Sequence, residues 1–259
     1  MDGAIIDLDG TVYRSNEPIP GAVKAINRMR SFDLDIVFAT NSSTKSIRTC
    51  VEKLESMGVS TNRNEILTSA SVTASYVSEA YSDAVAFVIG EDPLRDELSE
   101  RGVAISSDPC DAETLVVGKD RSFDFNTLQM TLNILDTGIP FIVTNPDRSS
   151  PTDSGIAPGT GAIIAAIVAA SGRDPDIVVG KPNESMANIT LDSVDSSPSE
   201  WLVIGDNVDT DIAMGKRAGM TTVLVQSGVD NRRVERNSST LPDYILDSLG
   251  SINEVLNSH

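Results

Sequence analysis

The sequence is poor in histidine, cysteine and aromatic residues, and each scarcity narrows the chemistry that the chain can perform. Its 259 residues include one histidine, two cysteines and 4% aromatic residues. The histidine is His259, the last residue, so histidine-based catalysis is not expected. Cys50 and Cys110 lack the spacing of metal ligands, and we expect both to be small core residues.

Long hydrophobic runs are also missing. The most apolar helix candidate, residues 160–171, is too short to cross a bilayer. The N-terminal stretch has no basic region followed by an apolar region and a cleavage site, which argues against a secretory signal. We therefore expect a cytoplasmic protein, long enough for one large domain or two moderate ones.

Basic residues are few as well. The chain has 20 Lys and Arg, of which 6 are Lys, against 38 Asp and Glu, and its formal net charge is −18. This charge disfavours nucleic-acid backbones and anionic membrane surfaces as partners. The acids are dispersed, which fits either an ordinary soluble acidic enzyme or adaptation to a salt-rich cytoplasm that screens self-repulsion. Composition leaves both interpretations open.

The sequence does contain a regular alternation of apolar runs and helix-period segments, which is typical of a parallel α/β sheet. Strands are expected at 3–7, 35–39, 85–89, 114–117, 140–144, 177–179, 201–204 and 221–225. Helices are expected at 42–58, 93–101, 126–137, 160–171 and 211–218. In the first helix, Ser42 or Ser43 is the expected N-cap and Gly58 the end. Its apolar face would consist of Ile47, Cys50, Val51, Leu54 and Met57.

Polar residues at expected strand ends indicate how the chain is organised. They cluster at 7–11, 40–43, 181 and 205–211, whereas residues 80–178 contain α/β elements but few candidate catalytic groups. An insertion between two halves of one catalytic domain would produce this distribution. We therefore expect a core formed by 1–79 and 179–259, interrupted by a second domain at 80–178.

The first strand runs directly into two aspartates, Asp7 and Asp9, which are followed by Gly10 and Thr11. Side chains alternate along a strand, so both carboxylates would point to the same side. Two close carboxylates repel unless they share a proton or a cation, and a hard divalent ion such as Mg²⁺ prefers oxygen ligands. An acidic strand-to-loop turn is the simpler alternative, but it explains poorly why an apolar run leads into the pair.

The segment Asp7-Leu8-Asp9-Gly10-Thr11 resembles motif one of the haloacid dehalogenase-like superfamily. The resemblance implies that Asp7 is a nucleophile that becomes an aspartyl-phosphate and that Asp9 is a general acid and base. Dehalogenases of the superfamily lack the second Asp, and P-type ATPases have Thr there. The presence of Asp9 therefore favours phosphate-ester hydrolysis.

Two further segments match in the same order. Thr40-Asn41-Ser42 ends a predicted strand and resembles motif two, where a hydroxyl and backbone N–H groups suit a phosphate oxygen. By itself this segment would be an ordinary helix cap. Lys181 matches motif three, and its ammonium would neutralise charge during phosphoryl transfer. A lysine before a proline is otherwise a common solvated loop residue.

The segment 201–220 resembles motif four, in which a buried strand delivers acidic residues to the metal. The resemblance implies that Asp206 binds Mg²⁺ directly and that Asp211 supports the metal shell or Lys181. Asp209 is better explained by the favourable position of an acid in the first turn of a helix. The family commonly has Arg where this chain has Asn207, a departure that leaves the metal site intact and affects the neighbouring contact.

As a set, the motifs resemble the NagD/para-nitrophenylphosphatase family over nearly the whole chain. The resemblance implies a Rossmann-like doubly wound parallel sheet with an inserted α/β cap domain. In the cap, Asn145, Asp147 and Arg148 follow a predicted strand and would reach towards the substrate, or else form a Pro/Asp turn with an Asx cap. The glycines around Thr160 are expected to start a helix rather than bind a second phosphate.

The function implied is hydrolysis of small phosphate monoesters, such as sugar phosphates, nucleoside monophosphates or para-nitrophenyl phosphate. Mg²⁺ would be held by Asp7, the backbone carbonyl of Asp9, and Asp206. The phosphoryl oxygens would be held by Thr40, Asn41, Ser42 and Lys181. A phosphotransferase and a non-catalytic phosphate-binding protein remain alternatives. The expected partner is a small phosphorylated metabolite, and the oligomeric state, including a homo-oligomer, is left open.

Overall fold

The computed structural model describes residues 1–152, 155–194, 196–228 and 240–257, and these residues form two units. The first comprises Met1–Thr40, Ile47–Leu67 and Lys181–His259, and the second comprises Asn41–Ser46 and Thr68–Gly180. The chain therefore crosses between the units after residues 40, 46, 67 and 180. His259, expected to take no part in catalysis, lies outside the described residues.

A six-stranded sheet with the order β15-β14-β13-β1-β4-β5 forms the centre of the first unit. The strands are β1 (Gly3–Asp7), β4 (Asp35–Thr40), β5 (Ile66–Thr68), β13 (Trp201–Gly205), β14 (Thr221–Val225) and β15 (Tyr244–Leu246). The pairs formed by β1, β4, β13, β14 and β15 are all parallel. The central strands are nearly continuous apolar runs because both faces of a parallel sheet are covered by helices.

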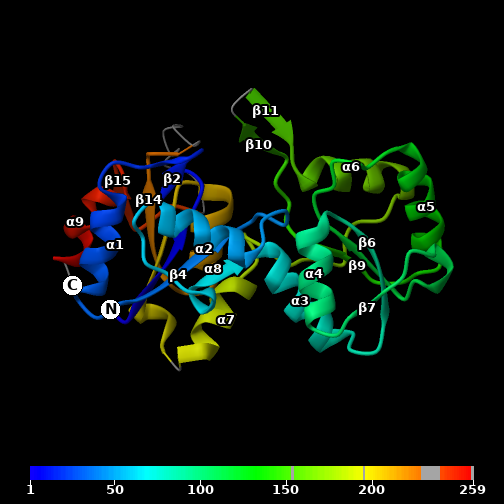
Figure 1. The fold of residues 1–259 in the computed structure, drawn as a ribbon, viewed down its shortest axis with the longest axis horizontal. Coiled ribbons are helices and arrows are strands. Elements are labelled where there is room, and N and C mark those ends of the chain that lie inside the picture. Colours follow the sequence, from blue (N-terminus) through cyan, green and yellow to red (C-terminus); the bar gives the residue numbers. More distant parts are fainter. Residues whose placement is uncertain (153–154, 195, 229–239, 258–259) are drawn as a thin grey trace. The chain divides into compact units, whose positions relative to one another are not determined.

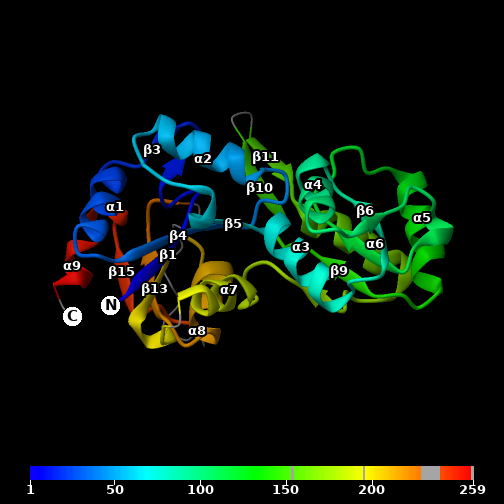
Figure 2. The same cartoon turned by 60° about the horizontal axis from the view of Figure 1, so that its bottom comes forward.

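Helices cover both faces of this sheet. One face packs against α1 (Ala22–Arg30), α2 (Ile47–Ser56) and α9 (Asn253–Leu256), which share a buried apolar cluster with β1 and β4. Figure 2 shows α7 (Ser185–Val194) and α8 (Ala213–Arg217) on the opposite side of the strands from α1 and α2. A short hairpin of β2 (Tyr13–Arg14) and β3 (Glu17–Pro18) follows β1.

The second unit contains a five-stranded parallel sheet with the order β12-β9-β8-β6-β7. The strands are β6 (Val85–Ile89), β7 (Ala104–Ile105), β8 (Thr114–Val117), β9 (Phe141–Val143) and β12 (Ile177–Val178). One face packs against α5 (Phe125–Asp136) and α6 (Thr160–Ser171), while α3 (Ser69–Ala80) and α4 (Asp92–Glu100) pack together on the other (Figure 1). A separate hairpin is formed by β10 (Ser149–Thr152) and β11 (Gly155–Pro158).

The predicted fold class is confirmed, since parallel sheets with helices on both faces form both units. All eight expected strands are present within two residues of their expected bounds. The second unit begins earlier than the expected boundary at residue 80, because α3 packs against α4. It ends at Gly180, two residues after the expected boundary at 178.

Three local predictions are wrong. The helix expected from residue 42 begins at Ile47, and neither Ser42 nor Ser43 caps it, because the Ser43 hydroxyl accepts the Lys119 N–H instead. The helix expected at 211–218 starts earlier, with a wide turn over Val208–Ile212. Cys50 is buried as expected, but Cys110 is exposed in a short turn.

Among the described residues, the helices all fall short of the length and hydrophobicity that crossing a membrane would require.

Candidate active site

Three adjacent strands of the first unit end in polar residues at the same edge of the sheet. β1 lies between β13 and β4, and Asp7, the last residue of β1, pairs in register with Ala39. Thr40, the last residue of β4, is 4% exposed, and Asp206 directly follows β13 and is 5% exposed. The carboxyl edge of an open parallel sheet is where such folds bind ligands. The parallel register therefore brings together residues that are far apart in the sequence.

Lys181 connects the acids at this edge. Its ammonium Nζ donates hydrogen bonds to Asp7 Oδ1 at 2.6 Å, to Asp211 Oδ1 at 2.7 Å and to the Ala39 carbonyl at 3.0 Å. The side chain is only 2% exposed. A buried ammonium requires such partners, because removing it from water is costly. Lys181 is therefore buried and hydrogen-bonded among these acids. It is not the solvated loop residue that a lysine before a proline commonly is.

Burial and neighbouring carboxylates shift the pKa values of Asp7 and Lys181 at this edge of the sheet. Burial raises the pKa of Asp7 well above its usual range, and the Lys181 ammonium opposes that rise. The neighbouring carboxylates of Asp211 and Asp206 raise the pKa of Asp7 further. Burial alone would lower the pKa of Lys181, but Asp211 and Asp7 outweigh it and the pKa is raised. Lys181 thus stays charged, while Asp7 needs more positive charge nearby to ionise readily.

The acids fit a divalent cation. Carboxylate oxygens of Asp7, Asp206 and Asp211 lie within 4.8 Å of one another. Lys181 supplies one positive charge against these three carboxylates, which leaves room for a cation that prefers oxygen ligands. The hydroxyl of Thr11, four residues after Asp7, is buried and has no hydrogen-bond partner among the described residues. The donor set and the excess of negative charge suit Mg²⁺.

Close backbone approach holds Asp206 in place. A Cβ atom on Gly10, whose φ is +99°, would lie 2.5 Å from Asp206 Oδ2, and one on Gly228 would lie 1.7 Å from the same oxygen. The Ser227 hydroxyl donates to the Gly10 carbonyl at 2.8 Å and ties the two loops together. Only glycine permits this packing on both sides of the carboxylate. The sequence analysis missed Gly228, because a glycine after a strand usually indicates only a turn.

Asp211 and Asn207 lie in the turn that follows β13. The backbone N–H of Asn207 donates to Asp211 Oδ2 at 3.2 Å, so that Asp211 is held on one side by this turn and on the other by Lys181. The Asn207 side chain accepts the Asp209 N–H at 2.9 Å. Asn207 thus caps the turn. This is the contact that Asn207 makes at the position where the family commonly has Arg. Asp209 stays exposed, as expected for an acid in a first helical turn.

Asp9 is exposed, and its carboxylate contacts a phenol, whereas that of Asp7 contacts an ammonium. The hydroxyl of Tyr13 lies 3.4 Å from Asp9 Oδ2 and donates to it. Tyr13 is fully buried, and burial together with the nearby Asp9 raises the pKa of its phenol. Tyr13 was missed in the sequence analysis, where a tyrosine four residues after Asp9 looks like an ordinary hairpin residue.

In the second unit, the other predicted site residues form a cluster of their own. Asn41 Nδ2 donates to Asp147 Oδ1 at 3.1 Å, and the Ser69 hydroxyl donates to the Asn41 carbonyl at 2.7 Å. Asn145 is 3% exposed, and its side-chain oxygen accepts the Asp147 N–H at 3.1 Å. This is the Asx turn considered as the structural alternative for this segment. Asp147 is only partly buried, and Arg148 is exposed.

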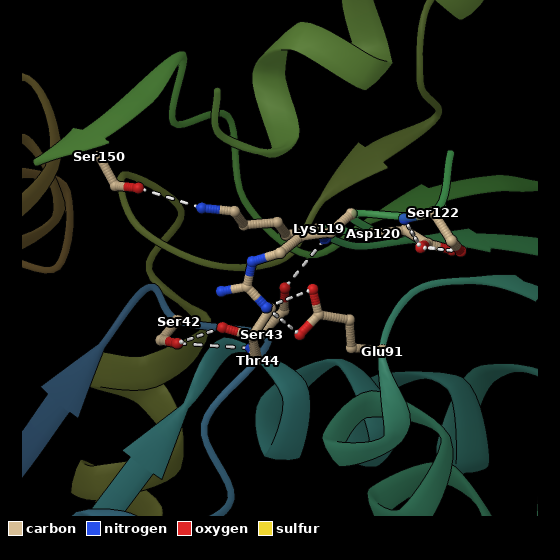
Figure 3. Close-up of polar contacts among 9 residues, drawn as sticks. Ser42, Ser43, Thr44, Glu91, Lys119, Asp120, Ser122 and Ser150 are labelled. Atoms are coloured by element: carbon tan, nitrogen blue, oxygen red, sulfur yellow. Dashed lines mark hydrogen bonds and ion pairs between the residues drawn. The ribbon is translucent and has the colours of Figure 1, made fainter. Parts of the chain in front are cut away.

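The segment that contains Ser42 is anchored to the carboxyl edge of the second unit's sheet (Figure 3). The Ser43 hydroxyl accepts the Lys119 N–H at 3.0 Å, and the Ser42 hydroxyl accepts the Thr44 N–H at 3.4 Å. Lys119 follows β8 and its ammonium donates to the Ser150 hydroxyl at 3.1 Å. Burial lowers the pKa of Lys119 from its usual value.

Comparison with known proteins places the chain among phosphate-ester hydrolases. The family model "Haloacid dehalogenase-like hydrolase" matches residues 4–104, and a second model of HAD-like hydrolases matches residues 178–252. The sugar-phosphatase AraL of Bacillus subtilis (strain 168) is 37% identical over 253 residues, which cover 98% of this chain and 92% of that protein.

Solved structures of phosphatases also match this chain. The p-nitrophenyl phosphatase from Archaeoglobus fulgidus matches with a TM-score of 0.90 and 37% identity, over 98% of each chain. NagD from E. coli K-12 strain matches with a TM-score of 0.88 and 29% identity, over 97% of this chain and 98% of that one. The similarity therefore extends over both units and not over the motifs alone.

Proposed function

Because the chain belongs to the haloacid dehalogenase-like hydrolases, we propose that it hydrolyses small phosphate monoesters in a Mg²⁺-dependent reaction with Asp7 as the nucleophile. The observation that carries the proposal is the buried network in which Lys181 binds both Asp7 and Asp211. The substrate class is supported by the names of the similar proteins, a sugar phosphatase and a p-nitrophenyl phosphatase.

The reaction has two steps, in which Asp7 carries the phosphoryl group and Asp9 transfers the protons. In the first, a carboxylate oxygen of Asp7 attacks phosphorus, the bond from phosphorus to the ester oxygen breaks, and Asp9 gives its proton to that oxygen. In the second, Asp9 takes a proton from water, whose oxygen attacks the phosphorus of the aspartyl-phosphate. Phosphate leaves and Asp7 is regenerated. An exposed Asp9 suits this role, because both the leaving oxygen and water must reach it.

Positive charge and hydrogen-bond donors stabilise the phosphoryl group. The Lys181 ammonium is fixed by Asp211 and Ala39, so it needs little rearrangement as charge develops. The Thr40 hydroxyl, at the end of β4, is assigned to a phosphoryl oxygen. Asn41 and Ser42, the next residues of the same motif, are assigned to the remaining oxygens.

Mg²⁺ would be held by Asp7, the Asp9 backbone carbonyl and Asp206, with Asp211 acting through Lys181. When bound, the ion would neutralise phosphoryl oxygens and draw Asp7 into its ionised form. The support is the acidic cluster of Asp7, Asp206 and Asp211.

The second unit is proposed to act as a cap that reads the leaving group and excludes bulk water. Its insertion between Thr40 and Lys181, the residues assigned to phosphate, supports this role. Asn145 and Asp147 are the cap residues assigned to substrate contact, and Asp147 is hydrogen-bonded to Asn41 of the phosphate motif. The cytoplasmic location expected from the sequence stays a prediction.

The test is release of inorganic phosphate from para-nitrophenyl phosphate, with and without Mg²⁺, by the full chain and by Asp7→Asn. We expect Mg²⁺-dependent release by the full chain and a loss of at least about a thousandfold in the variant. Rapid quench of the full chain should trap an acyl-phosphate at Asp7. Wild-type-like hydrolysis by Asp7→Asn would falsify the nucleophile assignment, and binding without release would identify a phosphate-binding protein.

A further inference from the structure

The two aspartates that follow β1 are held by chemically different groups. Asp7 accepts a hydrogen bond from the Lys181 ammonium at 2.6 Å, whereas Asp9 accepts one from the Tyr13 phenol at 3.4 Å. An ammonium favours the ionised form of its partner strongly, which suits a nucleophile. A phenol is neutral near pH 7 and donates a hydrogen bond without cancelling the carboxylate's charge.

Tyr13 is fixed relative to Asp9 by the short loop between them. The Tyr13 carbonyl accepts the Gly10 N–H at 2.8 Å, and the Tyr13 N–H donates to the Leu8 carbonyl at 3.2 Å. Asp9 and Tyr13 also form an isolated β-bridge. The buried ring of Tyr13 lies under the Lys53 ammonium, which is 3.9 Å from the ring centroid. The position of the phenol is therefore set by the backbone, by burial and by a cation above the ring.

We propose that Tyr13 is a positioning residue that orients the Asp9 carboxyl group for proton transfer, an inference that rests on the proposed phosphatase function. Its hydrogen bond to Oδ2, at 3.4 Å, orients the carboxyl group of an exposed residue. Asp9 then gives its proton to the leaving oxygen in the first step and takes one from water in the second. Tyr13 keeps its own proton in both steps. Misplacing Asp9 slows the first step only where the leaving group needs its proton, whereas the second step is the same for every ester, so the two esters differ in the first step alone.

The test compares two esters that differ in their need for a proton. Glycerol 2-phosphate releases an alkoxide that must be protonated, while para-nitrophenyl phosphate releases a stable phenolate. For Tyr13→Phe, which keeps the ring, we expect kcat/KM on glycerol 2-phosphate, which reports the first step, to fall by about tenfold, the low end for a hydrogen bond to a charged group. On para-nitrophenyl phosphate, kcat/KM should fall by less than about twofold, because its first step needs little help from the acid.

A double-mutant cycle separates positioning from a structural role. Once Asp9→Ala has removed the carboxyl group, adding Tyr13→Phe should cause no further loss on glycerol 2-phosphate. Lys53→Met is the matched control, because it removes a contact to the same ring and keeps the hydroxyl. It should leave the ratio of the two esters unchanged.

Other outcomes would overturn the inference. Equal losses on both esters in Tyr13→Phe, or losses that multiply with those of Asp9→Ala, would mean that Tyr13 only supports the fold. Hydrolysis of neither ester by the full chain would overturn the proposed function and this inference together. Normal hydrolysis by the full chain with an unchanged ester ratio in Tyr13→Phe would overturn the inference alone.

Discussion

The residues around Asp206 illustrate how backbone, rather than side chains, can position a buried carboxylate. Gly10 and Gly228 approach it from two loops that are more than two hundred residues apart in the sequence. Neither glycine offers a functional group. What they contribute is the absence of a Cβ atom, which lets two backbone segments confine a buried carboxylate that the proposed function assigns to Mg²⁺.

A first prediction concerns this confinement. Asp206→Asn should raise the Mg²⁺ concentration needed for half-maximal hydrolysis by about tenfold or more, because it removes a charged ligand. Gly228→Ala should raise it in the same direction by about tenfold, because the added Cβ displaces the carboxylate. Titration calorimetry with Mg²⁺ provides the binding constants independently of activity. An unchanged Mg²⁺ requirement in Asp206→Asn would remove this residue from the metal site.

A second prediction follows from the raised pKa of Asp7. Burial and the neighbouring acids raise this pKa, so in the metal-free protein ionising Asp7 costs stability as the pH rises. Mg²⁺ competes with protons for the carboxylates. The increase in Tm on adding Mg²⁺ should therefore be larger at about pH 8 than at about pH 5. In Asp7→Asn the difference between the two pH values should shrink, and a pH-independent increase in the full chain would contradict the argument.

Among the secondary-structure elements, α6 also begins where glycines allow close backbone packing. A Cβ atom on Gly159 would lie 2.1 Å from the Asp147 carbonyl oxygen, and the Gly161 N–H donates to that oxygen at 2.8 Å. The glycines around Thr160 therefore let a helix begin directly against the turn that carries Asn145 and Asp147. This close packing accounts for the motif without any second phosphate.

The third prediction tests this packing. Gly159→Ala should lower the free energy of unfolding by about 2–3 kcal/mol, because the new atom overlaps a backbone carbonyl that cannot move freely. Gly138→Ala is the control: no atom lies within 4 Å of its added Cβ, and its φ of +82° should cost only about 1–2 kcal/mol. Thermal unfolding of both variants measures which substitution causes the larger loss of stability. A smaller loss in Gly159→Ala than in the control would contradict the packing argument.

Strands and strand-end residues were predictable from the sequence, because continuous apolar runs ending in Asp or Thr are local signals. That is why Asp7, Thr40 and Asp206 could be assigned to strand ends from the amino-acid pattern alone. The start of α2 was not predictable, because Ser43 is used by an amide 76 residues away. Tyr13 and Gly228 were missed for the same reason: their importance lies in what the fold brings next to them.

For the whole molecule, the dominant feature is the net charge of −18. Some acids are paired in the structure, such as Glu65 with Arg30 and Asp243 with Lys216. Pairing cannot account for all of them, because 38 acids face only 20 basic residues, which leaves an excess of 18 acids. Repulsion among the remaining carboxylates opposes the folded state and is weakened by salt.

The fourth prediction is a salt dependence of stability. Raising KCl from about 0.1 M to about 2 M shortens the screening length to a few ångströms and should raise Tm by about 5 °C or more. Adaptation to a salt-rich cytoplasm predicts that activity on para-nitrophenyl phosphate is retained at the higher concentration. An ordinary acidic enzyme would gain little stability and lose activity, and that result would decide between the two interpretations of the composition.

The points at which the chain passes between its units have a consequence for how such proteins can be recombined. One crossing falls between Thr40 and Asn41, inside the motif assigned to phosphate, and another directly precedes Lys181. A chimera that inherits its second unit from a relative therefore inherits two of the three residues of this motif, Asn41 and Ser42, with it. Under the proposed function, substrate preference and part of the phosphate-binding motif would be exchanged together, and a graft that begins at residue 68 would separate them.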